Sequence, residues 1–175
     1  REAPASETPS LAVVPIVNTA GDSLDYLAVG IVRSAMDRLS GTRSLRVITA
    51  RDVRASGTPA RDLAALGRRV GVSAVLSGTL ARERDTVWLH VELQRSRDGA
   101  RLAGGRFAVE TPRLVAIESD LLDTVAVALG LARIRRDARK PRDAEATAIL
   151  MRARHYFDQR NTKSLLRARD LYLEA

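Results

Sequence analysis

Apolar residues in this chain repeat with two different periods, and the order of those periods constrains the fold most. Short apolar runs rich in β-branched residues predict buried strands at residues 11–17, 45–49 and 74–81. Apolar positions three and four residues apart predict helices at residues 23–40 and from Thr58-Pro59 to Val70. Strands separated by single helices favour parallel pairing with right-handed crossovers. The first half of the chain therefore predicts a β-α-β-α-β unit.

The following segment alternates between apolar and polar residues. Residues 87–94 follow this pattern, which is typical of a strand with one buried and one solvated face. The dipeptide Asp98-Gly99 is a strong hairpin signal, so residues 101–109 are expected to complete an antiparallel meander. Thr111-Pro112 then begins a helix that is expected to end at Gly130.

Together these patterns predict an α/β fold over residues 11–131, with a mixed sheet, two layers and the element order β-α-β-α-β-β-β-α. Pro15 weakens the first strand because it has no donor for the ladder, so it suits an edge or a bulge. Gly71 is expected to end a helix in a left-handed conformation. Gly78 is expected to allow a bulge or a close backbone contact within its strand.

Three further segments flank this domain. Residues 1–10 are rich in proline, alanine and serine and are interpreted as a linker tail. Residues 132–142 are interpreted as a basic linker, and residues 143–175 as two helices that form an αα-hairpin. Small and aromatic residues of this hairpin match parts of the tetratricopeptide pattern, namely Ala153, Tyr156, Ala168 and Tyr172. One such unit cannot bury its own face, so more repeats are expected to follow.

Composition excludes several classes of protein. The chain has no cysteine, which excludes disulfides, thiolate catalysis and cysteine-ligated zinc. It contains no run of about 18 apolar residues and no signal-peptide pattern at its start. Apolar residues make up 45% of the chain, enough for a core that needs no metal or disulfide. Because the chain opens at Arg1 and stops within a helical pattern, we interpret it as a piece of a longer protein.

The chain is basic, with 29 Lys and Arg against 21 Asp and Glu and a net charge of +8. The one concentration of this charge lies in the linker at residues 133–142. A solvated linker is favoured over a nucleic-acid patch, because charge blocks between domains usually stay solvated. The chain also has few aromatic residues for stacking on bases. Trp88 occupies the polar register of its strand, so either another element of the chain covers that face or Trp88 offers a contact surface; we favour intramolecular cover.

No motif for phosphate binding, dinucleotide binding, a serine nucleophile or a zinc protease occurs. His90 and His155 are isolated and are interpreted as solvated or partly packed side chains. Asp120 and Asp123 lie one helical turn apart, but with Glu118 they are interpreted as the wet face of a helix. We therefore assign no catalytic, cofactor-binding or metal-binding residue, and the sequence does not identify a ligand site.

Several sequence blocks resemble the TolB amino-terminal-like (FlgO-like) domain of bacterial signalling proteins. Leu11-Ala12-Val13-Val14-Pro15-Ile16-Val17-Asn18, Gly21-Asp22 and Tyr26-x-Ala28-x-Gly30 resemble its opening. Residues 45–48, 66–79 and 94–99 resemble its later blocks in order and spacing. The resemblance covers residues 11–131 and is specific for the fold. It departs at Val29, where the family often has an acidic residue, and at Ala103, where it often has tryptophan.

The resemblance implies a non-enzymatic sensory or protein-interaction module in a bacterial signal transducer. The effector is expected to be a membrane-tethered serine/threonine kinase, which would place the module on the periplasmic side. Alternatives are a nucleotide cyclase, or a winged-helix regulator without a membrane span, in which case the module is cytoplasmic. A nucleic-acid-binding domain that uses the basic linker is the alternative from another class. The expected partner is a protein or peptide bound through the helical repeats, with no cofactor or metal; the oligomeric state stays open.

Overall fold

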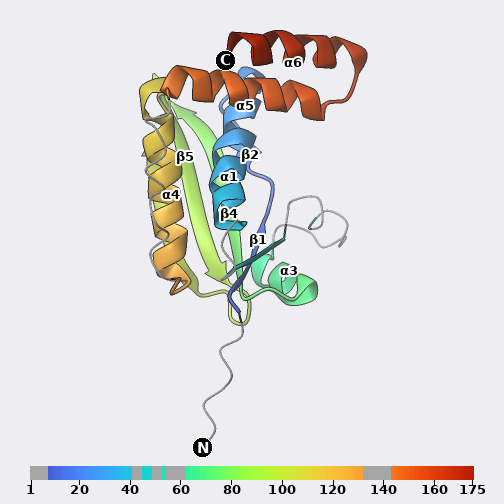
Figure 1. Ribbon diagram of the computed structural model, residues 1–175. Helices are drawn as coiled ribbons and strands as arrows, with labels where there is room; N and C mark the ends of the chain where they lie inside the picture. Colours follow the sequence, from blue (N-terminus) through green and yellow to red (C-terminus); the bar gives the residue numbers. More distant parts are fainter. Residues whose placement is uncertain (1–7, 41–44, 49–52, 54–61, 132–142) are drawn as a thin grey trace, which may run out of the picture.

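The computed structural model describes residues 8–40, 45–48, 53, 62–131 and 143–175. Its six strands form one mixed sheet (Figure 1). The strands are β1 Ser10–Val13, β2 Val17–Asn18, β3 Arg46–Ile48, β4 Ala74–Glu83, β5 Thr86–Arg95 and β6 Arg101–Ala108. The α-helices are α1 Asp25–Ser40, α3 Leu63–Val70, α4 Leu114–Ala128, α5 Ala144–Asp158 and α6 Thr162–Glu174, and short 3₁₀ turns precede α1 and α4.

The sheet combines parallel and antiparallel pairing. Its strands follow the order β3-β1-β4-β5-β6, and β2 pairs with a further stretch of β4. β1 is parallel to both β3 and β4, whereas β4, β5 and β6 form an antiparallel meander. The mixed α/β sheet expected from the two apolar periods is therefore confirmed.

Pro15 divides the expected strand at residues 11–17 into β1 and β2. The amide of Val14 still donates to the carbonyl oxygen of Leu76, at 3.0 Å. Pro15 has no amide proton to continue that ladder. Pairing resumes at Val17, which lies opposite Thr79 on β4. The observed element order therefore contains one strand more than expected.

The second helix begins later than the sequence predicted. The side chain of Asp62 accepts a hydrogen bond from the amide of Ala65, which makes Asp62 the N-cap of α3. Helix α3 thus starts at Leu63 rather than at Pro59; Thr58 and Pro59 themselves lie outside the described residues. Gly71 ends the helix with a φ of 67°, so the expected left-handed cap is confirmed.

The two faces of the sheet are covered unequally. Helices α1 and α4 pack on one face and form the larger core with side chains from β1, β4 and β5. Helix α3 packs on the opposite face, where Leu66 meets Ala12, Val14 and Val75 in a second, smaller core. The expected two layers are therefore wrong at this end of the sheet, where a third layer is present. The reason is that all four residues of β1 are buried, so both of its faces need cover.

The helical hairpin of α5 and α6 packs on the α/β domain through α5 (Figure 1). Met151 on α5 is buried in the larger core, directly against Gly30 on α1. An added Cβ at Gly30 would lie 2.8 Å from the Met151 Cγ atom, so this contact requires a glycine. Arg33 and Asp158 form an ion pair beside it. Helix α6 packs on α5 around Ala168 and is the outermost element. That this hairpin is of the tetratricopeptide type stays a prediction.

Candidate functional site

The isolated histidines lie at the surface, in different elements. His90 on β5 is partly exposed, and its Nε2 atom lies 3.3 Å from the Glu83 carboxylate. His155 on α5 contacts the side-chain nitrogen of Gln159 at 3.0 Å. Within the described part of the chain, no group of three or more His, Cys, Asp or Glu side chains is placed to hold a metal ion.

The structure places Glu118 differently from the sequence interpretation. Asp120 is exposed and Asp123 partly exposed, as expected for a solvated helix face, but Glu118 is fully buried on α4. It lies one turn after the buried Leu114 and therefore on the helix face that packs against α1. Arg38 on α1 approaches its carboxylate at 3.9 Å. The spacing of four from Leu114 was the signal that could have placed Glu118 in the core.

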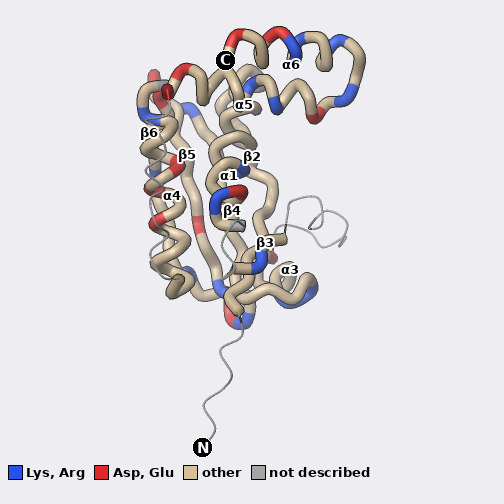
Figure 2. The backbone as a smooth tube through the Cα atoms, in the orientation of Figure 1, with Lys and Arg blue, Asp and Glu red and all other residues tan. Residues whose placement is uncertain are grey.

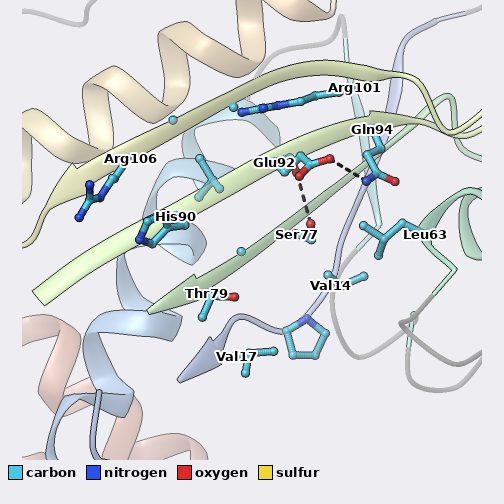
Figure 3. A pocket seen from close by; sticks show the side chains of 15 residues that line it. Val14, Val17, Leu63, Ser77, Thr79, His90, Glu92, Gln94, Arg101 and Arg106 are labelled. Carbon is cyan, nitrogen blue, oxygen red and sulfur yellow. Dashed lines mark hydrogen bonds between the residues drawn. The ribbon is translucent and has the colours of Figure 1, made fainter. Parts of the chain in front are cut away.

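The candidate site is the face of the meander that α3 leaves open. Side chains of β4, β5 and β6 alternate between the core and this face, so the polar residues of each strand gather on one side. Outside the area of α3, no helix of the described residues covers this face. A cavity of about 620 Å³ runs over it, here called the sheet trough (Figure 3). Its lining includes Val17, His90, Glu92, Arg101, Gly104 and Arg106.

The two banks of the sheet trough differ in chemistry. Figure 3 shows Arg101 and Arg106 on one side, Val14 and Val17 on the other, and His90 between them. Pro15 and the first residue of α3, Leu63, extend the apolar bank. The trough therefore offers an apolar bank and a cationic bank across a polar floor.

Close packing of the backbone forms part of the floor. An added Cβ at Gly78 would lie 2.6 Å from the backbone oxygen of His90, which confirms the close contact expected at this glycine. An added Cβ at Gly104 would lie 2.2 Å from a guanidinium nitrogen of Arg101, so this side chain lies flat over the glycine. Glu92 accepts a hydrogen bond from the Gln94 side chain at 2.7 Å.

Trp88 lies beside the sheet trough in a network that spans three strands. The guanidinium carbon of Arg106 is 3.8 Å from the centre of the Trp88 ring, close enough for a cation–π contact. The same Arg106 also forms an ion pair with Glu83, which in turn contacts His90. Arg106 therefore covers part of the Trp88 ring, but the ring stays partly exposed. The cover by another element that the sequence favoured is not found among the described residues.

A second candidate surface lies on the outer side of the helical hairpin. A groove of about 310 Å³ is lined by Phe157, Leu165, Ala168, Arg169, Tyr172 and Leu173. The large apolar residues among them are exposed, and Leu173 reaches 81%. We call this surface the hairpin groove. Contiguous apolar patches of this kind mark interaction sites more often than scattered single residues do.

The turn that joins β5 and β6 is held by Asp98. Its carboxylate accepts a hydrogen bond from the amide of Ala100 at 3.1 Å, and Gly99 adopts a φ of 72° beside it. This backbone hydrogen bond lowers the pKa of Asp98 below its ordinary value; desolvation opposes it, and hydrogen bonds from Arg95 and Arg97 lower the pKa further. The predicted Asp-Gly hairpin turn is confirmed.

The charges of the described residues are dispersed. Figure 2 shows basic and acidic residues interspersed along the hairpin, α1 and the strands, whereas the charged residues of α4 are all acidic. The arginine cluster in the linker at residues 133–142 lies outside the described residues. None of the described helices is both long enough and apolar enough to cross a membrane.

No protein-family model matches the chain. One curated protein is similar in sequence: "Putative adenylate cyclase 3" of Rhizobium meliloti (strain 1021), 28% identical over 167 residues. The match covers 92% of this chain and 28% of the relative, so the chain spans little more than a quarter of the length of this relative.

Several solved structures are similar to this one. TolB from Acinetobacter baumannii is 19% identical and matches with a TM-score of 0.49, over 71% of this chain and 29% of that chain. Lipoprotein GNA1162 from Neisseria meningitidis is 23% identical, with a TM-score of 0.48 over 67% of this chain and 96% of that chain. The LpoB C-terminal domain from Escherichia coli is 19% identical, with a TM-score of 0.47 over 62% and 87% of the two chains.

Proposed function

We propose that the chain is a non-enzymatic protein-interaction module of a bacterial signalling protein. The observation that carries this proposal is the hairpin groove, where four large apolar side chains stay exposed on a hairpin that is itself docked on the domain. Covering such a surface with another apolar surface lowers the free energy of the system by about 25 cal/mol for each Å² removed from water. The site thus supports binding rather than chemistry.

The occupant of the hairpin groove is the next helix of a tetratricopeptide-like array in the same polypeptide. Ala153 and Ala168 occupy the small positions at which α5 and α6 approach each other, and both are buried. Tyr172 and Leu173 then point outward from α6, where a following helix of an array would pack. Neighbour contacts of this kind supply most of the stability of a repeat array.

The sequence relative supports one of the effectors considered above. A match to about a quarter of a curated adenylate cyclase fits an accessory module inside a longer protein, and it favours the nucleotide cyclase over the serine/threonine kinase. The TolB-like identity of residues 11–131 rests on the sequence blocks that resemble that family. The periplasmic placement stays a prediction, and labelling of introduced surface cysteines in intact cells with a membrane-impermeant maleimide would test it.

Hydrogen exchange tests the proposed role of the hairpin groove. The amides of α6 should exchange more slowly in the longest natural polypeptide that contains this chain than in the 175-residue chain. Leu173→Glu should remove that protection, whereas Lys163→Glu on the exposed side of the same helix should keep it. Equal exchange of α6 in both polypeptides would show that no following helix covers the groove.

A further inference from the structure

Among the described residues that line it, the sheet trough has one unpaired cation. The lining holds the guanidinium groups of Arg101 and Arg106 against the carboxylate of Glu92, and Arg106 is already paired with Glu83 beside the trough. Glu92 already accepts a hydrogen bond from Gln94. Arg101 is exposed, and within the described part of the chain it forms no ion pair. A ligand that brings a carboxylate to this bank therefore meets one unpaired guanidinium among the described residues, that of Arg101.

The shape of the trough favours a polypeptide segment over a small molecule. Three strand spacings of about 4.8 Å separate β2 from β6, so the banks stand roughly 14 Å apart. The cavity is only partly enclosed, whereas small-molecule sites enclose most of the ligand surface. The opposite bank, with Val17 and Pro15, is apolar and exposed. A segment with carboxylates along one side and apolar side chains along the other would complement both banks.

Single-stranded nucleic acid is the other polyanion that a sheet face can bind. Such sites stack bases on exposed aromatic side chains. Trp88 is the single tryptophan of the chain, and Arg106 already lies over its ring. The described lining of the trough contains no aromatic residue except His90. The trough therefore suits carboxylates better than bases.

We propose that the sheet trough binds an acidic, partly apolar segment of a partner polypeptide. One of its carboxylates pairs with Arg101, and a second replaces Glu83 on Arg106. Its apolar side chains lie on Val17 and Pro15. This site lies on the sheet, away from the hairpin groove, and is independent of whether the groove is covered. It gives the module a recognition surface for a second protein.

A binding titration with a defined probe tests this proposal. The 175-residue chain is titrated with a short fluorescein-labelled peptide that alternates glutamate and valine, and anisotropy reports binding. An unlabelled sample is followed by the emission of Trp88, which senses any change at Arg106. A matched peptide with lysine in place of glutamate and an oligothymidylate serve as controls. Binding of the acidic peptide alone, with a change in Trp88 emission, is the expected result.

Three variants locate the binding. Arg101→Gln should weaken binding of the acidic peptide by roughly fivefold, the range of one exposed charge pair. Gly104→Ala keeps the charge but displaces the Arg101 side chain from the floor, so it should weaken binding similarly. Arg167→Gln removes an equal charge from the exposed surface of α6 and should leave binding unchanged.

Four outcomes would overturn the proposal. These are equal weakening by Arg101→Gln and Arg167→Gln, equal binding of the lysine peptide, tight binding of the oligothymidylate at physiological salt, and self-association of the chain through Arg101. None of them bears on the hydrogen exchange of α6, so the two proposals fail separately.

Discussion

The two faces of strand β5 differ although they are built from alternate residues of one segment. Leu89, Val91 and Leu93 point into the larger core and are almost fully buried. Between them, His90 and Glu92 point into the sheet trough and remain partly exposed. The first set stabilises the fold, whereas the second contributes little to stability and is free to serve recognition. Under the proposal above, stability and recognition are thus separated residue by residue along one strand.

The sharpest test of this separation compares two adjacent residues. Leu89→Ala should lower the free energy of unfolding by about 3 kcal/mol, because it leaves a cavity under α4 and α1. His90→Ala should change it by less than about 0.5 kcal/mol. Urea denaturation followed by circular dichroism measures both. Similar losses for the two variants would show that the open face also carries stability.

The second test concerns the one acidic side chain on the covered side. Glu118→Ala should cost about 2 kcal/mol, because it leaves a cavity and removes the carboxylate that Arg38 approaches. Arg38 is itself partly exposed, which limits the loss. Glu118→Met keeps the volume and should cost less than Glu118→Ala. If it costs more, the carboxylate is needed for its charge rather than for its packing.

A smaller effect is expected in the network next to the trough. Arg106→Ala removes both the contact with the Trp88 ring and the ion pair with Glu83. The expected loss is about 1 kcal/mol, since these groups are partly solvated. Trp88 emission should shift to longer wavelength as water reaches the ring. Unchanged emission would mean that Arg106 does not cover Trp88 in solution.

The smallest effect concerns the turn between β5 and β6. The folded state lowers the pKa of Asp98 below its ordinary value of 3.8, so its contribution to stability is present above that value and is lost as the pH falls through the lowered pKa. Asp98→Asn should therefore flatten the fall of stability below about pH 4. Unfolding midpoints measured from pH 2 to pH 6 would show this difference, and parallel curves for both proteins would contradict it.

Local patterns predicted much of this fold. The alternation in residues 87–94 gave β5 its two faces, and Asp98-Gly99 marked the turn that follows. Helix α3 was placed too early because Thr58-Pro59 is a good local start signal, and only the structure shows that Asp62 caps the helix. The third layer was missed although a continuous apolar run such as that of β1 is typical of a strand covered on both faces.

The candidate site was less predictable than the fold. The polar register of β5 predicted an open face, but its apolar bank comes from Val17 and Leu63, which are far apart in sequence. Crossover connections bring these residues together in space, and no local sequence pattern predicts which distant residues meet in this way. Glu118 was predicted wrongly for a different reason. Its charge suggested the solvated face of the helix, whereas its helical spacing from Leu114 indicated the buried face on which it lies.

The contact between Gly30 and Met151 gives a way to detach the hairpin from the domain. Any side chain at position 30 must displace Met151, and Gly30 itself is only partly buried. A protein engineer could therefore release α5 and α6 with Gly30→Leu while leaving the strands untouched. The released hairpin would then move relative to the domain. Comparing this variant with the unchanged protein would show whether the proposed signalling role needs a rigid contact between the hairpin and the domain.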